Sequence, residues 1–268
     1  MAYVFADGTD EERRLRDQST VLDPLTARLL DRAGLRPGMR VLDLGSGAGN
    51  VTALAADAVG PDGSVVGVDK DPDAVERARR LMAHRTNVEF HVDDVCRLDG
   101  TDDGFDAVVG RGVLMYLPDP VAALRVATGH LRPGGLICMQ EPDMTYLWAS
   151  RSTPLWDEVR RGFLEAFERA GVHARMGLSL FAAFREAGLP DPALVMEAPA
   201  GGGASSPAYG WANSFRAMLP LMERLGIAVS DAARAEDLTE RLDAEILAWD
   251  GIVLGPPLYG AWTTAPAT

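Results

Sequence analysis

The stretch that decides the fold reads Val41-Leu42-Asp43-Leu44-Gly45-Ser46-Gly47-Ala48-Gly49-Asn50, an apolar segment followed by three alternating glycines. Glycine lets the chain turn sharply and lets a ligand come close to the backbone, where a β-carbon would intrude. The amides at the start of a following helix would point at the same ligand. In an open parallel sheet such a turn lies at the carboxyl ends of the strands, where ligands bind. The stretch therefore predicts a strand, a tight turn and a helix start that together form a binding site.

Short apolar segments alternate with helix-like segments between residues 40 and 140, which is typical of a parallel sheet with crossover helices. The expected strands are Arg40–Leu44, Ser64–Asp69, Val88–Val92, Phe105–Gly110 and Gly135–Gln140. The expected helices are Asn50–Val59, Pro72–His84 and Pro120–Leu131, the last stopped by Arg132-Pro133-Gly134-Gly135. Proline follows aspartate at two of these helix starts, and proline is favoured in the first turn of a helix.

The segments on either side of this core are mainly helical. Before it, Asp10–Gly34 is predicted to form a helix that closes over the ligand as a lid. After it, the pattern predicts helices at Trp156–Ala170, Leu178–Ala187, Trp211–Leu225 and Ala232–Trp249, strands at Ala193–Glu197 and Pro257–Thr264, and a flexible loop at Gly201–Pro207. We expect four parts: residues 1–34 as the lid, 35–145 as the core, 146–250 as a mainly helical substrate-binding cap, and 251–268 as the last strand and tail.

The composition is that of an ordinary globular protein. The 268 residues are 47% hydrophobic and 24% charged, with a net charge of −13. An acidic surface repels a phosphate backbone, so a nucleic-acid partner is not expected. Cys96 and Cys138 lack the paired spacing of metal or redox motifs, so no metal is expected. We find no leader and no apolar stretch long enough to span a membrane, so we expect a cytoplasmic protein with no membrane partner.

An acidic residue at the end of the second expected strand indicates a nucleoside ligand. Asp69 follows Gly45 by 24 positions, close to the offset of ~20 residues at which a carboxylate meets a ribose hydroxyl in nucleoside-binding α/β folds. Adenosine is the ligand that this spacing favours. A dinucleotide-binding fingerprint would have its third glycine at position 50, where this chain has Asn50, and this disfavours NAD.

Five segments, in order, resemble the class I S-adenosylmethionine-dependent methyltransferases, especially the small-molecule group that includes the ubiquinone and menaquinone biosynthesis methyltransferases. They are the glycine turn, Val66-Gly67-Val68-Asp69, Val88–Val95, Phe105–Val109 and Leu131-Arg132-Pro133-Gly134-Gly135. The resemblance covers residues 25–140. It implies a Rossmann-like, doubly wound, mostly parallel seven-stranded sheet with helices on both faces. It also implies S-adenosylmethionine as the cofactor, with S-adenosylhomocysteine as the product.

The resemblance implies roles for residues around the glycine turn. Gly45, Ser46 and Gly47 would surround the methionine part of the cofactor. Asp69 would bind both ribose hydroxyls, and Lys70 would flank the adenine.

Further along the chain, Asp94 and the amide of Val95 would read the adenine edge, with Asp93 as the rival of Asp94. Arg111 would lie beside the methionine part of the cofactor. The N-terminal residues that would close over the cofactor are Tyr3 and Gln18.

With this cofactor the reaction would be an in-line displacement at an activated methyl group, in which positioning alone can supply ~7–11 kcal/mol. A general base is useful but not obligatory. The candidate bases are His173, in a joint between two cap helices, and Glu141, directly after a strand, whereas His91 and His130 have structural explanations. The candidate substrate-binding residues are Tyr146, Trp148, Trp211 and Arg216.

Three functions stay open. The first is a methyltransferase acting on oxygen, nitrogen or carbon of a small organic metabolite, of the kind found in specialised metabolism. The second is an NAD-dependent oxidoreductase, disfavoured by Asn50 and by a single lysine, Lys70, which forms no Tyr-x-x-x-Lys pair. The third is a protein that binds S-adenosylmethionine without methylating. The expected partner is a small-molecule substrate, and the expected state is a monomer or homodimer.

Overall fold

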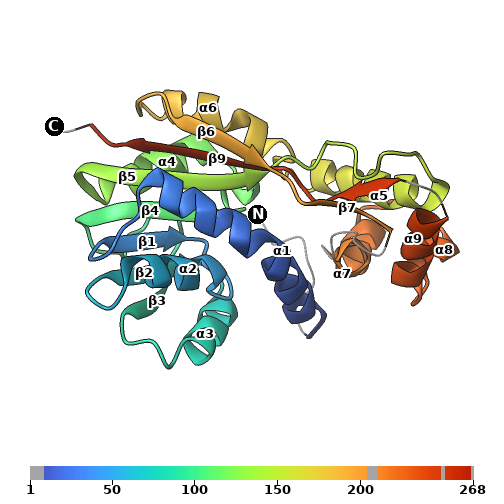
Figure 1. Cartoon of the computed structure of the whole chain (residues 1–268), viewed down its shortest axis with the longest axis horizontal. Helices are drawn as coiled ribbons and strands as arrows, with labels where there is room; N and C mark the ends of the chain where they lie inside the picture. The colour runs from blue at the N-terminus through green and yellow to red at the C-terminus, as the bar shows by residue number, and fades with distance from the viewer. Residues whose placement is uncertain (1–8, 204–209, 249–250, 267–268) are drawn as a thin grey trace. The chain divides into compact units, whose positions relative to one another are not determined.

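The computed structural model describes residues 9–203, 210–248 and 251–266, with side chains from residue 18 onward (Figure 1). The chain forms two compact units, which we describe separately. The sheet unit contains Asp23–Glu141, Met176–Met196 and Leu258–Thr268, and the helical unit contains Met1–Leu22, Pro142–Arg175 and Glu197–Pro257. Within the described ranges, every helix is too short or too polar to cross a bilayer.

A seven-stranded sheet is the centre of the sheet unit. Its strands are β1 (Arg40–Leu44), β2 (Ser64–Asp69), β3 (Val88–Val92), β4 (Phe105–Arg111), β5 (Leu131–Pro142), β6 (Ala193–Glu197) and β9 (Leu258–Thr264). Their order is β3-β2-β1-β4-β5-β9-β6, and β1 to β5 pair in parallel. This is a Rossmann-like, mostly parallel sheet, so the predicted fold class is confirmed.

Helices pack on this sheet through apolar faces. They are α1 (Thr9–Ala33), which begins in the helical unit, α2 (Asn50–Val59), α3 (Pro72–Leu81), the 3₁₀ helix η1 (Leu114–Tyr116), α4 (Pro120–Gly129) and α6 (Met176–Glu186). Leu29 of α1 and Ala55 of α2 share one buried cluster with Val41 of β1. Both Asp-Pro starts are confirmed, because Asp71 and Asp119 accept hydrogen bonds from the first turns of α3 and α4.

The helical unit has its own small core. Its elements are α5 (Pro154–Arg169), α7 (Trp211–Arg224), α8 (Asp231–Arg234), α9 (Leu238–Leu247) and an antiparallel pair of strands, β7 (Ala200–Gly202) and β8 (Ile252–Leu254). The rings of Trp148 and Trp211 stack with centroids 3.6 Å apart, and Phe163 meets both edge-on. All three side chains are buried.

Four expectations differ from the structure. Leu131 is already paired with Phe105, so Arg132-Pro133-Gly134-Gly135 lies within β5 and does not stop a helix. The helix expected at Ala232–Trp249 is two helices, because Ala235 has an extended ψ of 146°. Gly201 and Gly202 pair with β8 instead of forming a flexible loop, and residues 204–207 of that loop lie outside the described ranges. Helix α6, expected in the cap, belongs to the sheet unit.

Candidate functional site

The glycine turn lies at the carboxyl edge of the sheet. Leu44 is paired with Val68 and with Gly110, so the segments that follow β1, β2 and β4 leave the sheet beside one another. Gly45 and Gly47 have φ values of 64° and 52°, in the left-handed region that favours glycine. The predicted strand, turn and helix start are all present.

The two glycines have different surroundings. A β-carbon on Gly45 would lie 2.5 Å from Cγ2 of Val113, so the protein itself occupies that space. A β-carbon on Gly47 would meet no atom of the described residues within 4 Å. The backbone at Gly47 is therefore open to a ligand, whereas Gly45 is needed for packing against the segment that follows β4.

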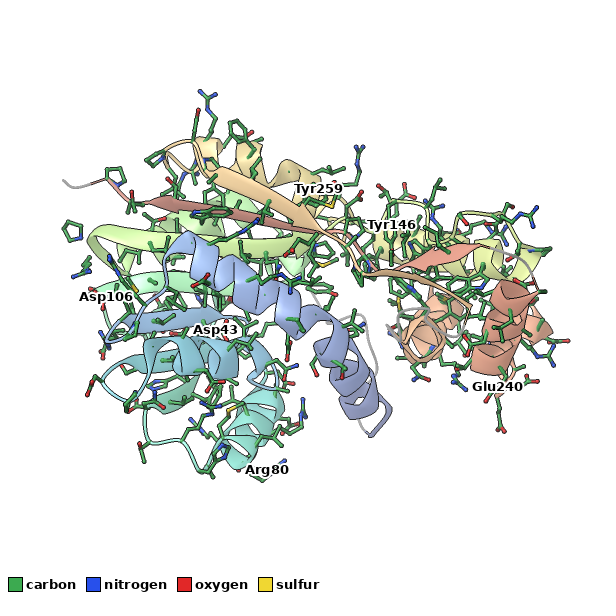
Figure 2. All side chains as sticks on the ribbon, viewed as in Figure 1. Asp43, Arg80, Asp106, Tyr146, Glu240 and Tyr259 are labelled. Atoms are coloured by element: carbon green, nitrogen blue, oxygen red, sulfur yellow. The ribbon has the colours of Figure 1, made fainter. Side chains whose placement is uncertain are left out.

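Asp43, the fourth residue of β1, carries a buried carboxylate beneath this turn (Figure 2). Its side chain is 1% exposed, and its Oδ2 accepts a hydrogen bond of 2.6 Å from the hydroxyl of Thr52 in α2. Among the described residues, neither Oδ1 of Asp43 nor the Oγ of Ser46 has a hydrogen-bond partner, although both atoms are buried. Because buried polar atoms are nearly always paired, these two atoms indicate a group that binds here.

Burial determines the protonation of Asp43. It raises the pKa of this carboxyl from 3.8 to about 7. The Thr52 hydroxyl and the positive charge of Arg111 oppose this rise, and the negative charge of Asp69 adds to it. A cationic group placed at Oδ1 would favour the ionised form.

Asp69 closes the turn and keeps further acceptor capacity. Its Oδ2 accepts from the amide of Gly47 at 2.9 Å, and its Oδ1 accepts from the amide of Asp71 at 3.0 Å. Each carboxylate oxygen has two lone pairs, so the half-buried Asp69 can still accept from ribose hydroxyls. Lys70 is exposed directly after it.

Asp93 and Asp94, the two candidates for binding the adenine, differ in their hydrogen bonds. Asp93 uses both oxygens to fold its own loop: Oδ1 accepts from the amide of Asp94, and Oδ2 accepts from Gly100 and Thr101. In Asp94, Oδ1 accepts from the amide of Cys96 at 3.0 Å, and this bond holds the pKa of Asp94 below its usual value. Asp94 is therefore the better candidate for binding a ligand, with Val95 buried beside it.

Glu141 is not placed as a general base, contrary to the sequence-based expectation. Its side chain is 0% exposed. Its carboxylate accepts from the amides of Val113 at 3.0 Å, Leu114 at 2.8 Å and Met115 at 3.3 Å. Burial raises its pKa to about 7, and the three amides oppose that rise. Glu141 holds the start of η1 in place.

Arg111, which was expected beside the methionine part of the cofactor, has hydrogen-bond partners within the protein. Its guanidinium donates to Asp23 at 2.9 Å and to the hydroxyl of Thr26 at 2.7 Å, and Thr26 donates to Gln140 at 2.6 Å. These bonds tie α1 to β4 and β5. The charge of Arg111 still acts on Asp43, so its influence on the turn is electrostatic.

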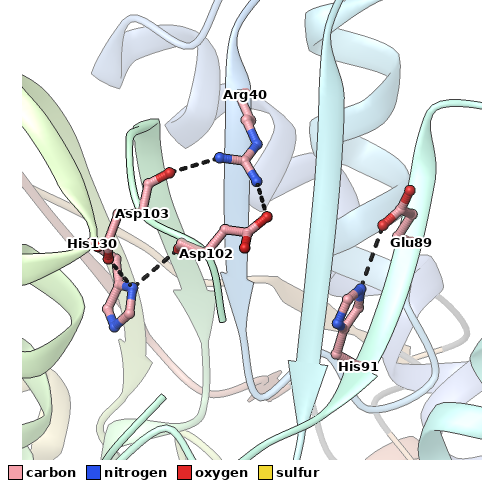
Figure 3. A network of polar contacts seen from close by, with 6 residues as sticks. All are labelled: Arg40, Glu89, His91, Asp102, Asp103 and His130. Atoms are coloured by element: carbon pink, nitrogen blue, oxygen red, sulfur yellow. Dashed lines mark hydrogen bonds and ion pairs between the residues drawn. The ribbon is translucent and has the colours of Figure 1, made fainter. Parts of the chain in front are cut away.

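His130 and His91 make polar contacts in the sheet unit, and His173 lies in the helical unit. His130 caps the end of α4 and contacts the Asp102 carbonyl and the Asp103 carboxylate, in a network with Arg40 at the amino end of β1 (Figure 3). His91 faces Glu89 on β3. His173 is exposed in the helical unit, next to Ala174, whose carbonyl accepts from the amide of Met144.

The residues expected to bind substrate form the framework of the helical unit. Trp148 and Trp211 are 2% and 4% exposed within the aromatic core, and the hydroxyl of Tyr146 donates to the Leu254 carbonyl at 3.0 Å. Arg216 donates to the Glu236 carbonyl and to Asn213, which ties α7 to the segment before α9. We therefore assign these four residues to packing.

Of the two N-terminal residues expected to close over the cofactor, the structure describes the side chain of one. Gln18 is half-buried within the helical unit, and its Nε2 lies 3.4 Å from the Ser214 hydroxyl. Tyr3 lies outside the described residues.

Sequence reasoning missed Asp43 and Thr52 as site residues. The signal was visible, because Asp43 is a charged side chain between two leucines in a strand expected to be buried on both faces. A buried charge requires a partner. Thr52 lies in the first turn of the following helix, but only the structure pairs it with Asp43.

The fold and the turn define a nucleoside-binding α/β domain. Comparison with known families narrows this further: residues 35–165 match the sequence model of a family described as "Methyltransferase domain". This part of the chain is therefore similar to methyltransferase domains.

Three curated relatives match part of this chain. An uncharacterized 37.1 kDa protein in transposon TN4556 of Streptomyces fradiae is 35% identical over 60% of this chain and 46% of its own length. An arsenite methyltransferase of Halobacterium salinarum is 38% identical over 41% of this chain and 28% of its own. A demethylmenaquinone methyltransferase of Staphylococcus aureus is 33% identical over 44% of this chain and 49% of its own. The chain thus spans about half or less of these relatives.

Solved structures share the fold. Phosphoethanolamine N-methyltransferase 2 of Haemonchus contortus, solved with phosphomonomethylethanolamine and S-adenosylhomocysteine, has a TM-score of 0.58 at 18% identity, covering 91% of this chain and 52% of that one. The [4+2]-cyclase SpnF has a TM-score of 0.52 at 18% identity, covering 92% and 81%. The same fold therefore occurs in proteins named for different reactions.

Proposed function

We propose that this chain is an S-adenosylmethionine-dependent methyltransferase that transfers a methyl group to oxygen, nitrogen or carbon of a small organic molecule. The observation that carries the proposal is the pair of buried, unpartnered oxygens of Asp43 and Ser46 beneath the glycine turn of a domain similar to methyltransferase domains. S-adenosylmethionine has a cationic amino group, ribose hydroxyls and an adenine amino group. All three are hydrogen-bond donors, and the carboxylates around the open turn are acceptors.

Each residue of the turn has a role in this proposal. Asp43 and Ser46 would hold the polar methionine end, Gly47 would let it approach the backbone, and Asp69 would accept from the ribose hydroxyls. Asp94 would accept from the adenine amino group. The amide of Val95 would read the adenine edge together with Asp94, and Lys70 would flank the adenine, as expected from the sequence.

When bound, the cofactor supplies a methyl group already activated by a positively charged sulfur. The chain then has to hold donor and acceptor in line and keep water away from them. His173 remains our candidate for removing a proton from the acceptor, because it is an exposed histidine of the helical unit. Replacing His173 by Ala should lower kcat without changing cofactor affinity.

We also infer that the substrate is a metabolite of specialised metabolism, methylated in the cytoplasm by a monomer or homodimer. The support comes from the charge and the cysteines of the chain. Its net charge of −13 disfavours nucleic acid, and Cys96 and Cys138 are both free thiols.

Calorimetric titration tests the cofactor first. S-adenosylmethionine and S-adenosylhomocysteine should bind in the micromolar range, and Asp69→Ala should weaken both. Asp93→Ala, which alters a carboxylate used inside its own loop, serves as the control. Binding of NAD, with no binding of the sulfur nucleosides, would favour an oxidoreductase and refute the proposal.

A second experiment tests methyl transfer, since the cyclase fold neighbour shows that a shared fold does not fix the reaction. The protein is incubated with methyl-labelled S-adenosylmethionine and pools of small molecules with hydroxyl, amine or activated carbon acceptors. Label should appear in a small molecule in proportion to the S-adenosylhomocysteine released. Cofactor binding without label transfer to any pool would favour a protein that binds the cofactor without methylating.

A further inference from the structure

Thr52 is a buried polar residue with an unusual partner. It lies in the first turn of α2, is 0% exposed, and its hydroxyl donates to Asp43 of β1. Helical threonines commonly donate to a carbonyl one turn earlier, as Thr128 in α4 does to Leu124 at 2.7 Å. Thr52 instead connects two elements beneath the glycine turn.

This bond leaves the two oxygens of Asp43 in different states. Oδ2 is fixed by the Thr52 hydroxyl, and Oδ1 has no partner among the described residues. The charged groups that act on the carboxylate are Arg111 of β4, which attracts it, and Asp69 of β2, which repels it. From α2 it receives only the neutral donor Thr52.

We propose that Thr52 is a positioning residue: its hydroxyl holds one oxygen of Asp43 and keeps the other as a buried anionic acceptor for the ammonium group at the amino-acid end of the cofactor. A hydrogen bond to the charged form of a carboxylate favours that form. A buried anion in turn favours a cationic donor over a neutral one. The ligand part of this inference rests on the proposed function.

The effect of Thr52 on Asp43 can be measured without any ligand. The carboxyl carbon of Asp43 is followed by ¹³C NMR from pH 5 to 9, and Asp43→Asn identifies its signal. Because a hydrogen bond to a charged group is lost, Thr52→Val should raise the titration midpoint of Asp43 by about one pH unit. Thr52→Ser restores the hydroxyl and should return the midpoint to the wild-type value.

Thr128→Val is the matched control, because it removes a helical threonine hydroxyl that does not contact Asp43. It should leave the midpoint unchanged. An identical midpoint in wild type and Thr52→Val would overturn the positioning role.

The ligand part is tested by calorimetry at pH 7 and pH 9 with two probes. S-adenosylhomocysteine carries the amino-acid end, and 5′-methylthioadenosine lacks it. At pH 7, Thr52→Val should weaken the binding of S-adenosylhomocysteine about fivefold, because a one-unit rise from a midpoint of about 7 lowers the ionised fraction of Asp43 from about one half to about one tenth. At pH 9 the loss should largely disappear, because Asp43 is then ionised in both proteins. Binding of 5′-methylthioadenosine should change little.

The outcomes separate the two claims. An equal loss at both pH values, or for both probes, would mean that Thr52 acts by packing alone and would overturn the inference. If wild type binds neither probe, the proposed function and the ammonium site both fail, and the NMR titration still decides whether Thr52 controls Asp43.

Discussion

Asp43 on β1 and Glu141 on β5 are two buried carboxylates near the same edge of the sheet, and they are used differently. Both are nearly inaccessible, and burial raises the pKa of each to about 7. Glu141 accepts three backbone amides, whereas Asp43 accepts one hydroxyl and has one oxygen without a partner. A raised pKa therefore does not by itself mark a functional acid, because the unused acceptor is what distinguishes Asp43.

The largest effect is expected when the structural carboxylate is removed. Glu141→Ala leaves the amides of Val113, Leu114 and Met115 buried without an acceptor. The free energy of unfolding should fall by about 3–5 kcal/mol, measured by urea denaturation at pH 8. Glu89→Ala, at an exposed glutamate of β3, is the control and should change it by less than about 0.5 kcal/mol. A loss below about 1 kcal/mol for Glu141→Ala would refute its structural role.

The glycine turn should show a smaller, position-dependent effect. Gly45→Ala combines left-handed strain with a clash against Val113 and should cost about 2–4 kcal/mol of unfolding free energy. Gly47→Ala carries the strain without the clash and should cost about 1 kcal/mol. Adding Val113→Ala should recover part of the loss in Gly45→Ala and none in Gly47→Ala. Equal costs at the two glycines would show that Val113 does not enclose Gly45.

The pH dependence of stability isolates the carboxyl of Asp43 in the ligand-free protein. Its pKa is raised to about 7 in the folded state, so the folded protein holds this proton more tightly than the unfolded chain does. The associated stability is complete below about pH 4 and is lost as the pH rises to about 7. Between pH 5 and pH 8, wild type should lose about 2–3 kcal/mol relative to Asp43→Asn in urea denaturation. A constant difference between the two proteins would contradict the raised pKa.

The smallest effect separates two neighbouring carboxylates. Asp94→Ala should weaken the binding of S-adenosylhomocysteine about tenfold, measured by calorimetry, since one hydrogen bond to a charged group is worth ~1.5 kcal/mol or more. Asp93→Ala should lower the unfolding free energy by about 1 kcal/mol, through the bonds to Gly100 and Thr101, with little change in affinity. The reverse pattern would give Asp93 the ligand role.

The sequence predicted the local features of the fold well. The bounds of β1, β2, β3 and β6 match the structure, because apolar segments bordered by glycine, aspartate and proline leave little freedom. The break between α8 and α9 was missed, because the helical spacing of apolar residues continues across Ala235. Periodicity reports which side of a helix is apolar and does not report a break.

The parts of the site that depend on the local backbone were predicted. The parts that depend on contacts between residues far apart in the sequence were missed. The glycines and Asp69 carry their signal within a short stretch. The partners of Arg111 lie 88 and 85 residues away, and the amides bound by Glu141 lie 26 to 28 residues away. No local pattern reports such pairings. The aromatic residues Trp148 and Trp211 were misassigned because core and pocket require the same apolar spacing.

The most direct test of the central claim is a crystal structure of the protein with S-adenosylhomocysteine. The ligand should lie against Gly47, and Oδ1 of Asp43 and the Oγ of Ser46 should gain hydrogen-bond partners from it or from its bound water. Glu141 should keep its three amide donors. A ligand bound elsewhere, or bound here with Oδ1 of Asp43 still unpartnered and Glu141 turned toward it, would contradict the account.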